Sequence, residues 1–368
     1  MRLNMVGLMD VETKINVIKS FAAEIVTEEE LRNLFATKEH PVAYDGFEPS
    51  GIAPLHFGVY RAKIIKKMLA IGIRFKLYLA DYFAYLNNKM GGNIDNIRTV
   101  GRYFVEVWKA AGVDTSKVEI IWSKDLMSDP SYWERFIKIG RVVPLDRTKR
   151  AITIMGRKEG EKISTGQIFY PIMQVTDIFQ MDIDICQLGL DQRKANMLAR
   201  EVAKKFGWKA PVVVSHPLLI GLKGMPPDLK TSDESVLMQY KMSKSDPKNS
   251  IFVHDTYEQI RKKINGAYCP ERIIDGNPII QYLEKLIIDD KTAPITIERP
   301  QKFGGDLELS NFNELLVFYK EGKIHPADLK EFVAKGLEKE IKPIREHFEK
   351  NKEAKELYEK VKTFEITR

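Results

Sequence analysis

The chain has 368 residues, of which 44% are hydrophobic and 30% are charged, and its formal net charge at pH 7 is +7. This length suffices for about two domains, and no apolar run approaches the roughly 18 residues that a membrane-spanning helix needs. The two cysteines, Cys186 and Cys269, lie far apart, and the histidines form no HExxH motif. The composition therefore disfavours disulfides and a bound zinc ion, while the modest basic excess suits a surface that meets a polyanion.

The N-terminal segment, residues 1–39, is predicted to be helical. Ile15, Ile18 and Ile25 recur at helical spacing, and Thr27 with Glu30 forms a capping pair for a second helix. The first twelve residues lack the apolar core of a secretion signal. We therefore expect a cytoplasmic protein.

From residue 40 onward, short β-rich runs alternate with amphipathic helices such as Tyr60–Ile71 and Asn96–Ala111. This alternation predicts an α/β domain with a Rossmann-like parallel sheet, whose ligands bind at the carboxyl ends of the strands. The predicted strands are Val42–Phe47, Phe75–Ala80, Val118–Trp122, Ile183–Leu188 and Val212–Ser215.

The second half of the chain changes character twice. Residues 223–252 are rich in Pro, Gly, Ser and Asp and read as a long loop, whereas residues 253–368 show mainly helical periodicity. We therefore divide the chain into an N-terminal helical segment (1–39), the Rossmann-like domain (40–222), a loop region (223–252) and a mainly helical domain (253–368).

Residues 241–245, here called the lysine loop, read Lys-Met-Ser-Lys-Ser and precede Asp246 and Pro247. Two lysines three positions apart among small residues suit a polyanion whose charge grows during a reaction, such as a triphosphate losing pyrophosphate. An isolated pair of this kind is more often a basic surface loop, so the rest of the chain must decide.

A glycine-rich segment follows the first predicted strand and leads into a helix through His56. Gly46, Gly51 and Gly58 let the backbone approach a ligand, and a histidine before a helix N-terminus suits a phosphate. The sequence contains neither a P-loop motif nor a dinucleotide-binding fingerprint, so these two phosphate-binding motifs offer no alternative interpretation.

A polar stripe lies on an otherwise apolar predicted helix, because Tyr170, Gln174 and Asp177 are spaced at i, i+4 and i+7. Buried polar groups are costly without partners, so a small polar ligand or a structural hydrogen-bond network must satisfy them. The next strand runs directly into Gly189, Asp191 and Gln192.

Together, the His56-Phe57-Gly58 element and the lysine loop followed by Asp-Pro resemble the two signature regions of class I aminoacyl-tRNA synthetases. The polar stripe makes the chain similar to the tyrosyl-tRNA synthetases of archaeal and eukaryotic type, over roughly residues 30–335. The resemblance implies a tyrosine–tRNA ligase that uses ATP and Mg²⁺, forms a homodimer through the region around residues 100–150 and binds tRNA(Tyr).

The resemblance also implies roles for individual residues. Those implied to bind L-tyrosine are Tyr44, Tyr170, Gln174, Asp177 and Gln192, with Asp81 as a further pocket residue and Phe83 as a wall. Those implied to bind ATP are Gly46, His56, Gly58, Gly189, Asp191, Lys241, Ser243 and Lys244, of which His56, Lys241 and Lys244 would be catalytic. Those implied to contact tRNA are Phe303, His325, Pro326, Asp328, Arg193 and Lys194. The chain departs from the family pattern at Val59, where a second histidine is usual.

Two other functions remain open at this point. The related tryptophan–tRNA ligases share the fold, although a Tyr–Asp pair suits a phenol, which both donates and accepts. A non-catalytic relative that binds RNA is the other alternative, but it would need no amino-acid pocket. In the absence of ATP, we expect the lysine loop to be open or mobile.

Overall fold

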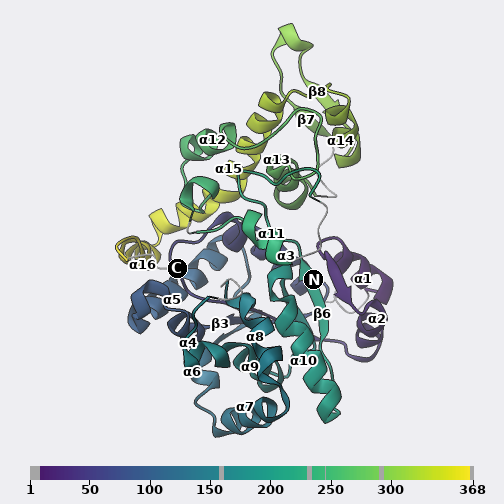
Figure 1. Cartoon of the computed structure of the whole chain (residues 1–368). Coiled ribbons are helices and arrows are strands. Elements are labelled where there is room, and N and C mark those ends of the chain that lie inside the picture. The colour runs from purple at the N-terminus through teal and green to yellow at the C-terminus, as the bar shows by residue number, and fades with distance from the viewer. Residues whose placement is uncertain (1–8, 157–160, 230–233, 245, 290–293, 365–368) are drawn as a thin grey trace, which may run out of the picture.

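The computed structural model describes residues 9–156, 161–229, 234–244, 246–289 and 294–364 (Figure 1). A six-stranded sheet has the order β1-β6-β5-β2-β3-β4, and β7 and β8 form a second, antiparallel sheet in the C-terminal part. In the large sheet only β1 is antiparallel to its neighbour. The strands are β1 Glu24–Val26, β2 Val42–Phe47, β3 Arg74–Leu79, β4 Val118–Trp122, β5 Ile185–Gly189, β6 Val212–His216, β7 Ile295–Ile297 and β8 Leu307–Leu309.

The five predicted strands are confirmed as β2 to β6, and each boundary differs by at most two residues. Their apolar runs were detectable because parallel strands are covered by helices on both faces. Every residue of β5 and of β6 is buried. The predicted Rossmann-like fold class is therefore confirmed.

The N-terminal segment differs from the prediction, because it contributes a strand as well as helices α1 (Val11–Lys19) and α2 (Glu28–Thr37). Strand β1 lies between these helices and pairs with β6, so the segment extends the main sheet. A strand of three residues is too short for an alternating pattern to reveal it.

Helices cover both faces of the sheet. Helices α3 (Ala62–Ala70) and α5 (Ile94–Ala110) share one apolar cluster with Ala43 and Leu77, whereas the opposite cluster contains Tyr44 and Tyr78. Neighbouring strand positions thus face opposite layers. The second layer contains α7 (Pro130–Val142), α9 (Thr165–Gln180) and α10 (Arg193–Phe206).

The C-terminal helices lie above one end of the sheet in Figure 1 and belong to the same apolar cluster as α3 and α5. They are α12 Tyr257–Asn265, α13 Pro278–Tyr282, α14 Phe312–Lys320, α15 Pro326–Lys350 and α16 Lys352–Lys362. Helix α16 is anchored where Tyr358 stacks on His254 at 3.6 Å between ring centroids. The C-terminal part therefore packs directly on the α/β layers.

Shorter helical elements connect these parts. They are η2 His56–Arg61, α4 Asp81–Leu86, η3 Lys89–Gly92, α6 Ser123–Leu126, α8 Leu145–Ala151, η4 Ile152–Met155, η5 Leu190–Gln192, α11 Glu234–Tyr240, η6 Pro247–Asn249, η7 Leu283–Ile287 and η8 Gln301–Phe303. Within the described ranges, no helix combines the length and the apolar character needed to cross a bilayer.

Candidate active site

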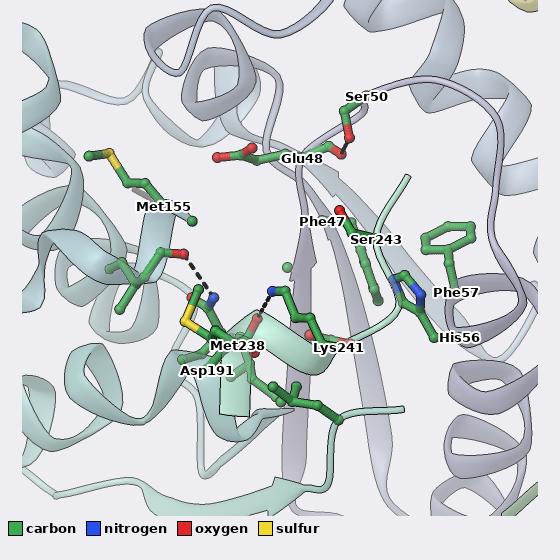
Figure 2. A pocket seen from close by; sticks show the side chains of 18 of the residues that line it. Phe47, Glu48, Ser50, His56, Phe57, Met155, Asp191, Met238, Lys241 and Ser243 are labelled. Atoms are coloured by element: carbon green, nitrogen blue, oxygen red, sulfur yellow. Dashed lines mark hydrogen bonds and ion pairs between the residues drawn. The ribbon is translucent and has the colours of Figure 1, made fainter. Parts of the chain in front are cut away.

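A cavity of about 1340 Å³ opens at the carboxyl ends of β2, β5 and β6 (Figure 2). This is the edge at which a parallel sheet binds its ligands. The structure brings most of the predicted site residues to this one cavity from segments far apart in the sequence. Those that line it are Tyr44, Gly46, His56, Tyr170, Gln174, Asp177, Gly189, Asp191, Gln192, Lys241, Ser243 and Lys244.

His56 is the first residue of η2, and it lies on the cavity wall beside the lysine loop. The following side chain, Phe57, packs against Phe47 at 5.0 Å and Trp108 at 4.8 Å between ring centroids, which fixes the start of the helix. Burial, with Lys244 and Lys241 nearby, lowers the pKa of His56 to about 3. The imidazole is therefore neutral at pH 7, and one ring nitrogen carries a hydrogen that it can donate.

Gly58, predicted to face ATP, does not line the cavity. A Cβ added there would lie 2.3 Å from Val253 Cγ1 and 3.1 Å from Val107 Cγ1. The glycine is required because the segment after the lysine loop packs against η2. That segment also pairs with the chain before His56, since Leu55 N donates to the carbonyl oxygen of Ile251 at 2.8 Å.

Residues 241–244 of the lysine loop line the cavity rather than standing open, whereas the expected mobility of the loop stays a prediction. Lys241 forms an antiparallel bridge with Ile220, and Met242 is 2% exposed. The backbone N–H of Met242 donates to the carbonyl oxygen of Leu219 at 2.7 Å. The buried methionine and these backbone contacts dock the loop, which its Gly- and Pro-rich flank did not reveal.

Both loop lysines have partners in the cavity. Lys241 Nζ lies 2.7 Å from Asp191 Oδ2, and Figure 2 shows the two groups facing each other. Lys244 Nζ lies 3.0 Å from Ser50 Oγ and 4.8 Å from the centroid of the Phe104 ring. Burial and the charge of Lys89 lower the pKa of Lys244 to about 7.

A buried charged and polar cluster lies at this end of the cavity, and its members Asp45, Arg61 and His216 line the cavity. Arg61 is 2% exposed and contacts Asp45, Gln187 and His216. Burial raises the pKa of Asp45 to about 6, although Arg61 opposes that shift. Sequence reasoning missed this cluster, because its members come from three strands and a helix with no local motif.

The polar stripe of α9 forms one wall of the cavity. Tyr170 donates from its hydroxyl to Glu48 Oε1 at 2.7 Å. The amide of Gln174 donates to Gln192 Oε1 at 3.3 Å, and Gln192 in turn donates to the carbonyl oxygen of Ile154. Glu48 was not predicted, although its position two residues after Gly46 places it at the end of β2.

The far end of the stripe is deeper. Asp177 is 1% exposed, and its Oδ1 accepts a hydrogen bond from the Tyr132 hydroxyl at 2.9 Å. Asp177 Oδ2 and the hydroxyl of Tyr44 have no hydrogen-bond partner in the described part of the chain. Burial raises the pKa of Asp177 well above its usual range. Phe83 packs edge-on against Tyr170 at 4.6 Å between centroids and forms a wall, as predicted.

The prediction that Asp81 belongs to the pocket is wrong. Its carboxylate is fully buried outside the cavity lining. One oxygen accepts from Ser123 Oγ at 2.5 Å and the other from Arg98 Nε at 2.9 Å. Asp81 therefore ties the start of α4 to α5 and α6, a role that its neighbourhood in sequence did not indicate.

Of the residues predicted to contact tRNA, Lys194 lines the cavity, whereas Arg193, His325, Pro326 and Asp328 do not. His325 caps α15, where its Nδ1 accepts from the backbone N–H of Ala327 at 3.1 Å, and Pro326 and Asp328 follow in the first turn. Arg193 pairs with Glu24 at 2.8 Å, and Lys194 Nζ donates to Thr153 Oγ1 at 3.2 Å. The side chain of Phe303 lies outside the described part of the structure.

Comparison with known proteins identifies the family. Residues 36–342 match the family of class I tRNA synthetases for tryptophan and tyrosine. A cytoplasmic tyrosine–tRNA ligase of Arabidopsis thaliana is 41% identical over 98% of this chain and 90% of its own length. The tyrosine–tRNA ligase of Sulfurisphaera tokodaii is 41% identical over 94% of this chain and 95% of its own.

Comparison with solved structures supports the same family assignment. The tyrosyl-tRNA synthetase of Pyrococcus horikoshii complexed with L-tyrosine superposes with a TM-score of 0.88 at 37% identity, covering 95% of this chain and all of that one. The tyrosyl-tRNA synthetase of Aeropyrum pernix gives 0.83 at 35% identity over 96% of this chain and 99% of its own. The chain therefore belongs to the tyrosyl-tRNA synthetases of the class I tRNA synthetase family.

Proposed function

We propose that the cavity is the site at which this tyrosine–tRNA ligase joins L-tyrosine to ATP and then transfers it to tRNA(Tyr). The observation that carries the proposal is the buried pair at its deep end. The Tyr44 hydroxyl and Asp177 Oδ2 have no partner among the described residues, and a phenol supplies both a donor and an acceptor. An indole N–H would satisfy only the carboxylate, which disfavours tryptophan as the substrate.

The α-ammonium of tyrosine would lie at the other end of the α9 stripe. Tyr170, Gln174 and Gln192 offer oxygen atoms there, and the carboxylate of Glu48 receives the Tyr170 hydroxyl. A positive charge at this place would be stabilised by Glu48. These contacts would leave the tyrosine carboxylate directed toward His56 and the lysine loop.

ATP would occupy the remaining half of the cavity. Asp191 and Gly189 would hold the ribose, while neutral His56 donates to a phosphate and Lys241, Ser243 and Lys244 contact the leaving pyrophosphate. Lys241 now pairs with Asp191, so nucleotide binding would exchange that ion pair for contacts with ribose and phosphate. Gly58 would act through packing alone.

The chemistry needs no covalent enzyme intermediate. The tyrosine carboxylate attacks the α-phosphorus of ATP, pyrophosphate leaves, and the terminal ribose of tRNA then attacks the tyrosyl-adenylate at its 2′-hydroxyl. The protein positions the reactants and stabilises the developing charge. Mg²⁺ would enter bound to the ATP phosphates, because this ion keeps most of its water and is commonly held through substrate phosphates.

For tRNA, we propose that the start of α15 reads the anticodon, with Phe303 stacking on a base and His325, Pro326 and Asp328 contacting base edges. Unpaired bases are recognised in this way. Arg193 and Lys194, at the start of α10 beside the cavity, would meet the acceptor end. Their present partners, Glu24 and Thr153, would be exchanged for phosphates.

A homodimer is supported by an apolar surface on α7 and α9. Trp133, Ile137 and Phe169 are 46%, 67% and 46% exposed, and Phe136 joins them through edge-on ring contacts. Monomeric proteins rarely expose such clusters. Replacing Ile137 with Asp should convert a dimer to a monomer in analytical ultracentrifugation.

We also propose a cytoplasmic location, which one relative's name supports.

ATP–pyrophosphate exchange tests the function directly. Exchange should depend on tyrosine and be absent, or lower by orders of magnitude, with tryptophan or phenylalanine. Exchange with tryptophan alone would overturn the substrate assignment. Binding of tRNA without any exchange would favour a non-catalytic RNA-binding protein instead.

A further inference from the structure

Tyr78, in β3, lines the cavity and has no role in the site proposed so far. Its side chain is 3% exposed, and its hydroxyl has no hydrogen-bond partner in the described ranges of the chain. Buried hydroxyl groups are almost always hydrogen-bonded, because leaving one unpaired is costly. The unpaired hydroxyl therefore indicates a missing partner.

The ring of Tyr78 is held from two sides. Gly46 is its partner in the parallel register of β2 and β3, and a Cβ added to Gly46 would lie 3.4 Å from Tyr78 Cδ1. Phe83 packs edge-on against the other side at 6.1 Å between ring centroids. Burial and the charge of Asp177 raise the pKa of Tyr78, and the side chains of Asp177 and Ser123 both lie close enough to its hydroxyl to shift that pKa, although neither is placed at hydrogen-bond geometry.

Three unpartnered polar atoms therefore meet at the deep end of the cavity. They come from β2, β3 and α9: the hydroxyls of Tyr44 and Tyr78 and Oδ2 of Asp177. A substrate phenol has one hydrogen to donate and two lone pairs that accept. Its group can donate to Asp177 and accept from both tyrosines, which leaves none of the four groups unpaired.

We propose that Tyr78 is a specificity-determining residue whose hydroxyl donates a hydrogen bond to the phenolic oxygen of the substrate. This inference rests on the proposed tyrosine pocket and adds a third contact to it. With phenylalanine bound, the hydroxyls of Tyr44 and Tyr78 and the carboxylate of Asp177 all lose that partner. Tyr78 thus strengthens the rejection of phenylalanine.

Tyr78→Phe tests the proposal, because it removes the hydroxyl and keeps the ring that packs on Phe83. In ATP–pyrophosphate exchange, kcat/KM for tyrosine should fall about tenfold, the usual effect of one hydrogen bond. The value for phenylalanine should stay constant, so the ratio of the two falls about tenfold. Tyr257→Phe, which removes a phenol hydroxyl that lies outside the cavity lining and donates to Glu331 on α15, is the control and should leave the ratio unchanged.

A purely structural role would lower both kcat/KM values equally and keep their ratio, which would overturn the proposal. Should Tyr78→Phe fail to fold, Tyr78→Met offers the same comparison, because methionine fills irregular apolar space. The outcomes are separable from the function itself. If the unmodified protein activates tyrosine but Tyr78→Phe keeps the ratio, only the role of Tyr78 is wrong.

Discussion

The two ends of the cavity treat their polar groups in opposite ways. At the deep end, Tyr44, Tyr78 and Asp177 each present a buried polar atom without a partner among the described residues. At the nucleotide end, Nδ1 of His56 also has no partner among the described residues, but both loop lysines are paired, Lys241 with Asp191 and Lys244 with Ser50. The deep end thus has polar atoms that a ligand can pair directly. At the nucleotide end, a ligand must replace the existing contacts of the two lysines.

This difference matches two tasks. Recognition of a small side chain profits from groups that are fixed and unpaired, because any substrate that fails to pair them binds poorly. Charge that develops during a reaction is better served by groups whose contacts can be exchanged for it. We therefore expect the residues of α9, β2 and β3 to determine selectivity for the amino acid. The lysine loop should determine the rate of tyrosyl-adenylate formation.

Removing the polar side chains of Tyr44 and Asp177 should have the largest effect on the selectivity for tyrosine over phenylalanine. Tyr44→Leu combined with Asp177→Gly replaces both groups that match the phenol, so tyrosine should lose its advantage over phenylalanine by orders of magnitude. Tyrosyl-tRNA synthetases are themselves the standard example of such rejection, at about 10⁵-fold, and this magnitude belongs to that example rather than to the geometry of this cavity. The measurement is the ratio of kcat/KM for the two amino acids in pyrophosphate exchange. Unchanged discrimination would show that the deep end does not read the hydroxyl.

The lysine loop should show the opposite behaviour. Lys244→Ala should lower the rate of tyrosyl-adenylate formation about 10²- to 10³-fold, as expected when one group that stabilises transition-state charge is lost. Tyrosine affinity, measured by equilibrium binding, should change little because Lys244 lies in the nucleotide half. Lys248→Ala, an exposed lysine four residues later, is the matched control. A variant with near-normal exchange would contradict the assignment of rate to the loop.

Most residues of the cavity wall were predictable from sequence, whereas the buried cluster around Arg61 at its nucleotide end was not. Tyr170, Gln174 and Asp177 share one helix, so helical periodicity alone places them on one face. Arg61, by contrast, meets its partners from β2, β5 and β6, and such long-range contacts leave no local pattern. The strands were predictable because their burial on both faces produces continuous apolar runs.

Two predictions that differ from the structure, the pocket role of Asp81 and an open lysine loop, have the same origin. The family resemblance implied that Asp81 is a pocket residue, but its carboxylate turns to Ser123 and Arg98, which the sequence could not place. The loop was expected to be open because its flanks are rich in Pro and Gly. A flank rich in Gly and Pro permits many backbone conformations. Which conformation the loop adopts depends on its contacts with distant residues such as Ile220, which composition does not reveal.

Gly58→Ala tests how far the nucleotide end extends. The added Cβ would lie 2.3 Å from Val253 Cγ1, so the variant should lose about 1–3 kcal/mol of unfolding free energy through overpacking. Gly266→Ala, whose Cβ would meet only atoms at 3.7 Å, is the control and should change stability far less. Denaturant unfolding measures both. If the KM for ATP rises at Gly58 without any loss of stability, the glycine faces the nucleotide after all.

The smallest expected effect is a difference in pH dependence between ATP use at the nucleotide end and tyrosine binding at the deep end. Burial and the charge of Lys89 lower the pKa of Lys244 to about 7, below its usual 10.5. Because the unfolded lysine keeps its proton to higher pH, this group destabilises the fold at low pH, and the penalty is relieved as pH rises from about 7 to 10.5. Its contact with pyrophosphate, however, needs the ammonium, so kcat/KM for ATP should fall up to tenfold per unit above pH 7.

A pH profile between about 6 and 9 measures this, since kcat/KM reports groups of the free enzyme. Lys244→Arg should keep its charge throughout this range and lose the decline that Lys244 causes. Tyrosine binding should lack the decline that Lys244 causes in both proteins, because Lys244 lies in the nucleotide half of the cavity. A decline in kcat/KM for ATP that persists in Lys244→Arg would assign the titration to another group, such as the nucleotide phosphates, and would remove the lysine's pKa as the reason that the two ends differ.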